Sequence, residues 1–167
     1  MAVSVRANGR HDTMPGSGKT GQALLLFRSG TALLLLGIIS GLTTTLMANP
    51  RMGLSAHVEG LLNGILLIAL GAAWTAVELP HGLKRVALLL LVAGSWTNWA
   101  ATQLAAFWGT EKLTPIVGAQ MTGTAIHEAI VSTMLVVVVA LMSGGLILVM
   151  VGFCQRPAQS ERDLPKP

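Results

Sequence analysis

The stretch "TALLLLGIISGL", residues 31–42, shows no polar face at helical spacing. A helix on the surface of a soluble protein carries a polar side opposite its apolar stripe, so this stretch favours a helix in lipid over one in a soluble bundle. The composition agrees, because 52% of the 167 residues are apolar and only 11% are charged. Ordinary soluble domains contain about 25% charged residues. The sequence therefore predicts a membrane protein.

Four stretches lack Asp, Glu, Lys, Arg and His altogether, namely 29–50, 60–77, 86–110 and 129–155. A membrane helix needs roughly 20 predominantly apolar residues to cross about 30 Å of hydrocarbon. We therefore expect an all-α integral membrane protein, a bundle of four transmembrane helices within one domain over residues 23–152. The expected helices lie at about 23–47, 54–77, 83–108 and 122–152. The flanking tails, 1–22 and 153–167, are rich in Gly, Pro, Ser and charge and are predicted to be disordered.

Basic residues gather on one side of the predicted membrane. They are Arg6, Arg10, Lys19, Arg28, Lys84, Arg85, Arg156, Arg162 and Lys166. Only Arg51 and Lys112 fall on the other side. The positive-inside rule then places both termini in the cytoplasm and the 48–53 and 109–121 loops outside. We expect a multi-pass protein of the cell inner (plasma) membrane, and this topology accounts for the net charge of +4 without a nucleic-acid partner.

Two apparent motifs carry no function. "PGSGKTG" (15–21) resembles a phosphate-binding loop, but the first glycine of that motif would fall at Thr13 and no strand precedes it. Cys154 is the single cysteine, so the chain has neither a disulfide framework nor a paired-cysteine metal site.

Polar residues recur at one depth in the predicted bundle. They are Thr43, Thr44, Thr45, His57, Glu59, Asn63, Asn98, Thr102, His127 and Glu128. An ionisable residue near the bilayer centre costs on the order of 2.5–3.5 kcal/mol, so such residues tend to face a bundle interior and to be functional. We expect them to form a reaction site in the outer half of the membrane. For His57, His127 and Glu128, a position in the headgroup zone is the alternative.

One stripe of the second predicted helix carries His57 with the glycines Gly53, Gly60, Gly64 and Gly71. Such glycines usually serve close packing between helices. They would also leave a flat surface for a planar cofactor beside the histidine. The two interpretations are compatible.

Two segments carry a resemblance to a known family. "NPRMGLSAHVEGLLNG" (49–64), together with "SWTNWAATQLAAFWG" (95–109), resembles the hydroxylaminobenzene mutases, which are four-helix membrane proteins that convert hydroxylaminobenzene to 2-aminophenol. More distantly, H-x5-N from His57 and W-x-N from Trp96 resemble the styrene oxide isomerases, trimers that hold ferric haem b between subunits through an axial histidine. Those isomerases have a tyrosine where this chain has Thr102, which favours the mutase interpretation.

The resemblance implies a homotrimer in the lipid bilayer that binds haem b and a small aromatic substrate. It implies His57 as the ligand to the haem iron, with Gly60 and Gly64 beside the cofactor. Ferric haem would be the Lewis acid that activates the N–O bond. Glu59 or Glu128 would be the general base. The resemblance also places Asn63 and Asn98 near the substrate, and we expect Trp96 or Trp99 to lie against its ring, with Thr102 as a further substrate contact.

Two other classes of protein remain open on the sequence. A membrane electron-transfer protein could hold haem between two histidines, His57 and His127. A small proton-coupled transporter could use Glu59 or Glu128 as its coupling carboxylate. The isomerase is preferred because the two quoted segments resemble the hydroxylaminobenzene mutases, whose redox-neutral reaction needs neither NAD nor flavin.

Overall fold

The computed structural model describes residues 17–155, which form helices and no strand. Four long helices are α1 (Ser17–Leu42), α2 (Pro50–Ala73), α3 (His81–Trp108) and α5 (Ala125–Cys154). The short pieces are α4 (Pro115–Gly118) and the 3₁₀ turns η1 (Thr44–Leu46) and η2 (Trp74–Ala76). The rest of the two predicted tails, residues 1–16 and 156–167, lies outside the described residues.

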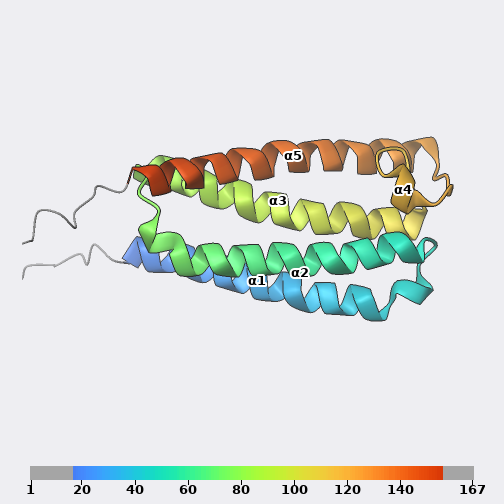
Figure 1. Cartoon of the computed structure of the whole chain (residues 1–167), viewed down its shortest axis with the longest axis horizontal. Helices are drawn as coiled ribbons and strands as arrows, with labels where there is room; N and C mark the ends of the chain where they lie inside the picture. The colour runs from blue at the N-terminus through green and yellow to red at the C-terminus, as the bar shows by residue number, and fades with distance from the viewer. Residues whose placement is uncertain (1–16, 156–167) are drawn as a thin grey trace, which may run out of the picture.

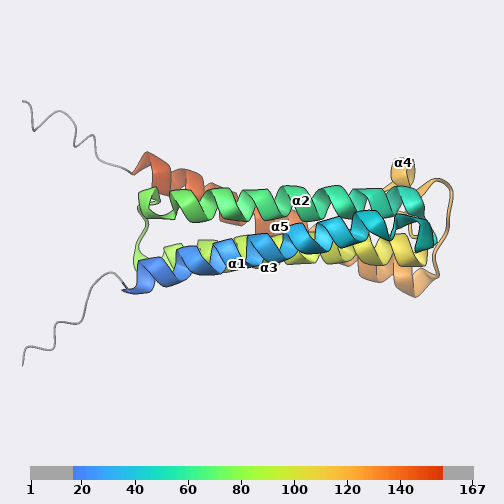
Figure 2. The same cartoon turned by 90° about the horizontal axis from the view of Figure 1, so that it is seen from below.

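The long helices form two antiparallel hairpins, α1–α2 and α3–α5, which join mainly along α2 and α3. The start of α1 and the end of α5 lie at one end of the bundle, here called the terminal end (Figure 1). The loop that carries α4 lies at the opposite end, here called the α4 end. Towards the α4 end, α5 diverges from α2, and α4 lies beside α2 there (Figure 2).

Glycines set the distance between α1 and α2. A Cβ atom added to Gly60 would lie 2.6 Å from the Cα of Gly37, and one added to Gly64 would lie 2.8 Å from the carbonyl oxygen of Gly30. The two backbones are thus in direct contact, as small residues allow in membrane helix pairs. The close-packing role predicted for this glycine stripe is therefore confirmed.

The helix ends differ from the predicted ones at identifiable residues. The first helix ends at Leu42 rather than near 47, and the Thr43 hydroxyl donates to the Ile39 carbonyl where the chain turns into η1. The second begins at Pro50 rather than 54, because the Asn49 side chain accepts hydrogen bonds from the backbone N–H groups of Arg51 and Met52. Proline at the first helical position supports this start. The last helix begins at Ala125 rather than 122, after the capping residue Thr124. At its other end, α1 begins at Ser17, inside the predicted tail.

Within residues 17–155, three helical segments are long and apolar enough to cross a membrane, namely Gly21–Leu42, Pro50–Ala76 and Ala125–Cys154. The chain is therefore a multi-pass membrane protein. The 28-residue α3 does not meet the same criterion. Its second half carries the polar run from Ser95 to Gln103, which lowers its hydropathy. The fourth span stays a prediction.

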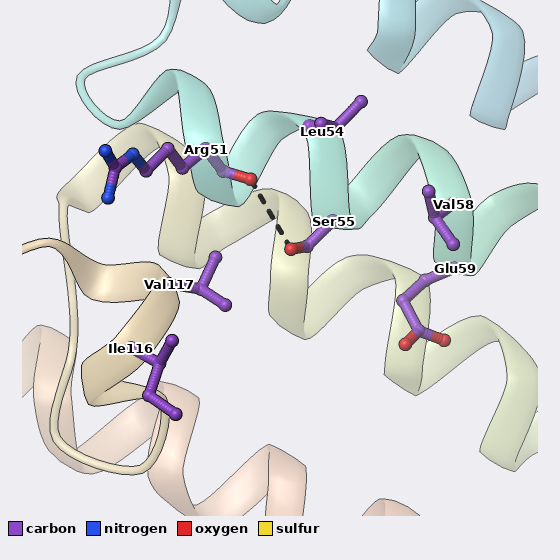
Figure 3. Close-up of a pocket in the computed structure, with 7 residues that line it drawn as sticks. All are labelled: Arg51, Leu54, Ser55, Val58, Glu59, Ile116 and Val117. Carbon is purple, nitrogen blue, oxygen red and sulfur yellow. Dashed lines mark hydrogen bonds between the residues drawn. The ribbon is translucent and has the colours of Figure 1, made fainter.

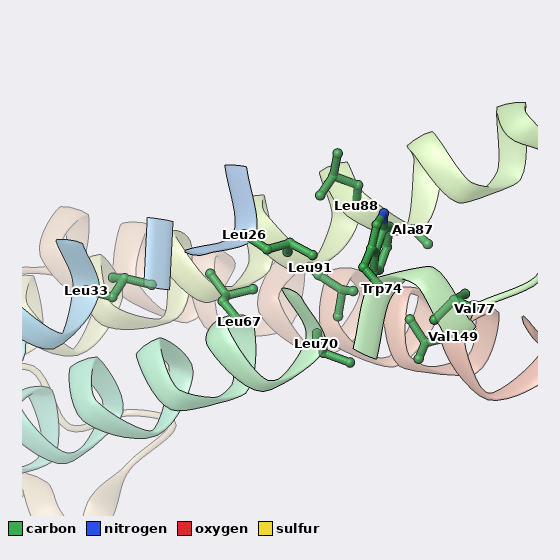
Figure 4. Packing of buried hydrophobic residues seen from close by; sticks show 10 residues of the cluster. All are labelled: Leu26, Leu33, Leu67, Leu70, Trp74, Val77, Ala87, Leu88, Leu91 and Val149. Carbon is green, nitrogen blue, oxygen red and sulfur yellow. The ribbon is translucent and has the colours of Figure 1, made fainter. Parts of the chain in front are cut away.

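The larger apolar core lies towards the terminal end, around Trp74 (Figure 4). Trp74 is fully buried among the helices. Its indole N–H donates to Gln22 at 2.9 Å. The buried Lys84 ammonium donates to the carbonyl oxygens of Trp74 and Val77 at 2.7 and 2.6 Å, which satisfies the end of α2.

Candidate functional site

Glu59 on α2 is the centre of a polar cluster between α2 and α3. Its Oε2 accepts hydrogen bonds from the side-chain amides of Asn63, at 3.2 Å, and Asn98, at 2.6 Å. Asn63 lies one turn further along α2 and is 5% exposed, whereas Asn98 comes from α3. The sequence predicted these three residues as one constellation, and the structure brings them together.

The geometry leaves one oxygen of the Glu59 carboxylate available. Oε1 accepts no hydrogen bond from any residue in the described range 17–155. An ionised carboxylate only accepts hydrogen bonds, and two amide donors on one oxygen fix its orientation. The cluster can therefore present a pre-oriented base or hydrogen-bond acceptor to a neighbouring molecule.

A cavity of about 380 Å³ adjoins Glu59 at the α4 end. One wall is a face of α2 and the other is α4 (Figure 3). The lining residues are Arg51, Leu54, Ser55, Val58, Glu59, Ile116 and Val117. A mostly apolar lining with a single internal acid is typical of a site for a small, largely apolar ligand. We call this cavity the Glu59 pocket.

His57 lies on a different side of α2, against α1. Its Nδ1 is 2.7 Å from the carbonyl oxygen of Gly37. A carbonyl only accepts, so Nδ1 carries the proton in this contact and Nε2 is the nitrogen left to bind a ligand. The ring is in tight contact with Gly41, where an added Cβ would lie 2.6 Å from Nδ1. A backbone carbonyl that orients the far nitrogen is the usual arrangement behind a metal-binding histidine.

The half-buried imidazole borders a surface groove of about 410 Å³. The groove is lined by Ile38, Gly41, Leu42, Thr44, Pro50, Leu54 and His57. A haem needs one axial nitrogen and an apolar surface for its macrocycle. The residues present at this groove therefore fit the implied group.

The remaining implied cofactor contacts do not border this groove. Gly60 and Gly64 are covered by α1, which leaves no space for a planar group beside them. His57 and Glu59 are two residues apart, which turns their side chains about 200° from each other around the helix. Within one chain, the two side chains thus point to different sides of α2, and the histidine groove and the Glu59 pocket share only Leu54 among their lining residues.

The carboxylate of Glu128 is held by backbone hydrogen bonds and is not free to act as a base. Its carboxylate accepts three backbone hydrogen bonds, from the N–H groups of Glu111 at 2.9 Å, Lys112 at 3.0 Å and Gly123 at 3.3 Å. Both oxygens are engaged, so this acid fastens the two ends of the 109–124 loop. The depth in the membrane that the sequence predicts for Glu128 could not distinguish this role in fastening the loop from a role in catalysis.

His127 stacks on Trp108 of α3, with ring centroids 4.3 Å apart. His57 by contrast lies in the α1–α2 hairpin, on the side that faces α1. Within one chain the two histidines occupy different hairpins, which disfavours a shared haem iron.

The other predicted substrate contacts are divided between elements. Trp99 donates through its indole N–H to Ser40 of α1 at 3.1 Å and packs edge-on against Trp96. Ser40 also donates to Gln103 at 2.7 Å, so a second polar network joins α1 to α3. Thr102 is buried and bonds to backbone carbonyls of its own helix. None of the three predicted contacts, Trp96, Trp99 and Thr102, lines the Glu59 pocket.

Sequence reasoning missed Asn49, which is 1% exposed and organises the α4 end. Its amide N–H donates to the carbonyl oxygens of Val117 and Gly118 at 3.1 and 3.0 Å, while its Oδ1 caps α2. The Asn-Pro pair at 49–50 was the available signal, since it marks a helix start.

Long apolar helices around an oriented carboxylate and a small pocket define a membrane protein with an enzyme-like site. The chain belongs to the styrene oxide isomerase family, whose sequence pattern matches residues 22–154. It is 40% identical to hydroxylaminobenzene mutase HabB of Ectopseudomonas oleovorans over 141 residues, which cover 84% of this chain and 86% of the relative. It is 38% identical to hydroxylaminobenzene mutase HabA of the same organism over 128 residues, or 76% and 95% of the two chains. No solved structure matches the chain.

These relationships confirm the resemblance seen in the two polar segments. They make the chain a membrane isomerase.

Proposed function

We propose that this isomerase converts hydroxylaminobenzene and related arylhydroxylamines to 2-aminophenols. The names of the two mutase relatives support this substrate class. The observation that carries the proposal is the 2.6 Å hydrogen bond from Asn98 to Glu59, which holds a carboxylate beside a pocket of suitable size.

The reaction requires one oxygen transfer and one proton transfer. The N–O bond breaks, a C–O bond forms at the ortho carbon, and the hydrogen on that carbon leaves as a proton while the nitrogen gains one. The atoms and electrons balance without an external oxidant or reductant. Glu59 is the proposed base for the ortho proton, through its Oε1 atom. Asn63 and Asn98 hold the carboxylate in place for that transfer.

Haem b is the proposed cofactor, with His57 Nε2 as its protein ligand. Gly37 fixes the imidazole, Gly41 gives it space, and the apolar side chains of Ile38, Leu42 and Leu54 line the adjoining groove. When bound, ferric haem would supply a Lewis acid that weakens the N–O bond.

The proposed assembly is a homotrimer. The groove beside His57 lies on the surface of the single chain, with Leu42 and Leu54 exposed at its edges. Since His57 and Glu59 of one chain face opposite sides of α2, both would serve one substrate only if two neighbouring chains contribute to the site. In the membrane, the proposed arrangement has four spans and cytoplasmic termini.

The first experiment is an absorption spectrum of the protein in mild detergent, followed by addition of hydroxylaminobenzene. A Soret band that shifts with substrate, while 2-aminophenol accumulates, would support a haem-dependent mutase. Product without a Soret band would exclude haem from the mechanism and assign the chemistry to Glu59. No product in either case would contradict the proposed function. The variant His57→Ala should lose both the Soret band and turnover, and full activity in that variant would exclude the haem role.

A further inference from the structure

We infer that α4 is a wall of the substrate pocket that selects the size of the ring substituent, with Val117 as the specificity-determining residue. This inference rests on the proposed function and deepens it. It starts from the lining of the Glu59 pocket, where α2 supplies five residues and α4 supplies Ile116 and Val117 (Figure 3).

Different residues line the two ends of the Glu59 pocket. Glu59 lies at one end, and Val117 and Ile116 lie across from Arg51 and Ser55 towards the other (Figure 3). A substrate whose nitrogen and ortho carbon lie at Glu59 would therefore point the far edge of its ring at α4. A substituent on that edge meets the Val117 side chain, which is partly buried.

The position of α4 is fixed from two sides by polar contacts. Asn49 donates to the carbonyl oxygens of Val117 and Gly118, and its backbone N–H donates to Ala106 of α3 at 2.9 Å. Glu128 holds both ends of the loop through three backbone N–H groups. Asn49 and Glu128 are thus positioning residues for α4.

Two further features of the 109–124 loop are consistent with α4 being a wall of the pocket. Ala119 and Gln120 follow α4 with φ values of 56° and 63°, a left-handed conformation that costs energy in residues other than glycine. Ile116 is 90% exposed although it is a large apolar residue at the pocket edge.

The test compares kcat/KM for 4-tert-butyl-hydroxylaminobenzene with that for hydroxylaminobenzene. Val117→Ala should raise this ratio about tenfold or more, because one or two methyl groups in a substrate pocket change discrimination by about 10–200-fold. Val117→Phe should lower the ratio. Leu113→Ala is the matched control, because Leu113 is an exposed apolar residue of the same loop that does not line the pocket. An active Val117→Ala enzyme with an unchanged ratio would overturn the inference.

The positioning role of Asn49 is tested by Asn49→Ser. Serine still caps α2, but its side chain is too short to reach the α4 carbonyl oxygens. The variant should shift the kcat/KM ratio for the two substrates in the same direction as Val117→Ala. An unshifted ratio would contradict the role of Asn49.

A binding measurement separates this inference from the proposed reaction. In a Cys154→Ser background, aniline should slow the reaction of N-ethylmaleimide with Val117→Cys at least threefold, and not with Leu113→Cys. Aniline has the ring and the nitrogen but no oxygen to transfer, so the result does not depend on turnover. Protection without product formation would refute only the reaction, and equal labelling with and without aniline would refute the pocket wall.

Discussion

Asn98 of α3 donates a hydrogen bond of 2.6 Å to Glu59 of α2, and this contact joins the two helical hairpins at the carboxylate itself. The contact thus links the packing of the bundle to the orientation of the proposed base. Changing either partner should affect catalysis before it affects folding.

Glu59→Gln should lower kcat for 2-aminophenol formation at least 100-fold, because an amide cannot accept the ortho proton. General bases typically contribute 10²–10⁴-fold. The glutamine keeps the shape of the side chain, so the protein should fold and bind substrate. Glu111→Gln, on the 109–124 loop, is the control. A Glu59→Gln enzyme within twofold of the wild type would place the base elsewhere.

Asn98→Ala should lower kcat about tenfold or more, since hydrogen bonds to charged groups contribute about 1.5–3 kcal/mol. In a double-mutant cycle with Glu59→Gln, the two losses should be strongly non-additive, because both residues act through one contact. Steady-state kinetics of the two single variants and the double variant measure this coupling. Additive losses would mean that Asn98 acts independently of Glu59.

Gly41→Ala should reduce haem content, because the added Cβ would lie 2.6 Å from His57 Nδ1 and displace the ring. The ratio of Soret absorbance to protein concentration measures the effect. Gly82→Ala is the control, because nothing lies within 4 Å of a Cβ added there. Equal haem content in the two variants would show that the contact between Gly41 and His57 does not determine whether His57 binds the haem iron.

Gly60→Ala should destabilise the α1–α2 hairpin by about 1–3 kcal/mol, since the added methyl meets backbone rather than a movable side chain. The midpoint of thermal unfolding in detergent should fall. Gly144→Ala, whose Cβ would make an ordinary contact of 3.5 Å with Leu90, should leave that midpoint almost unchanged. A similar midpoint in both variants would argue against direct backbone packing.

Lys84→Met should destabilise the protein by about 3 kcal/mol or more, because the Trp74 and Val77 carbonyl oxygens lose a charged donor in a buried place. Arg85→Met, at the neighbouring exposed position, is the control. Unfolding of each variant at increasing concentrations of a denaturing detergent would measure the difference in stability. Equal resistance of the two variants would mean that water replaces the ammonium.

The long helices and the Glu59 cluster could be predicted because their signals are local. Apolar runs of membrane length require helices, and Glu59 and Asn63 share a face by their spacing of four residues. The sequence placed Asn98 in the same layer of the bundle, but its contact with Glu59 was not predicted. The separation of His57 from Glu59 also follows from helical geometry, although the resemblance had combined the two residues in one site.

The loop at 109–124 could not be predicted in the same way. The three donors to Glu128 are backbone N–H groups, which leave no trace in residue type. The burial of Trp74 depends on Gln22 and Lys84, which are far from it along the chain or lie on another helix. Such contacts depend on how the hairpins pack, and a pattern along one helix does not contain that information.

The division into two hairpins has a consequence for how the chain is made. The α1–α2 pair packs through its own glycine backbones, so it can form before α3 is added. The α3–α5 pair would then dock on it through the 2.6 Å contact at Glu59 and the hydrogen bond from Glu78 to Gly152. The hydrogen bonds that orient the proposed base would thus be completed only when α3 has docked.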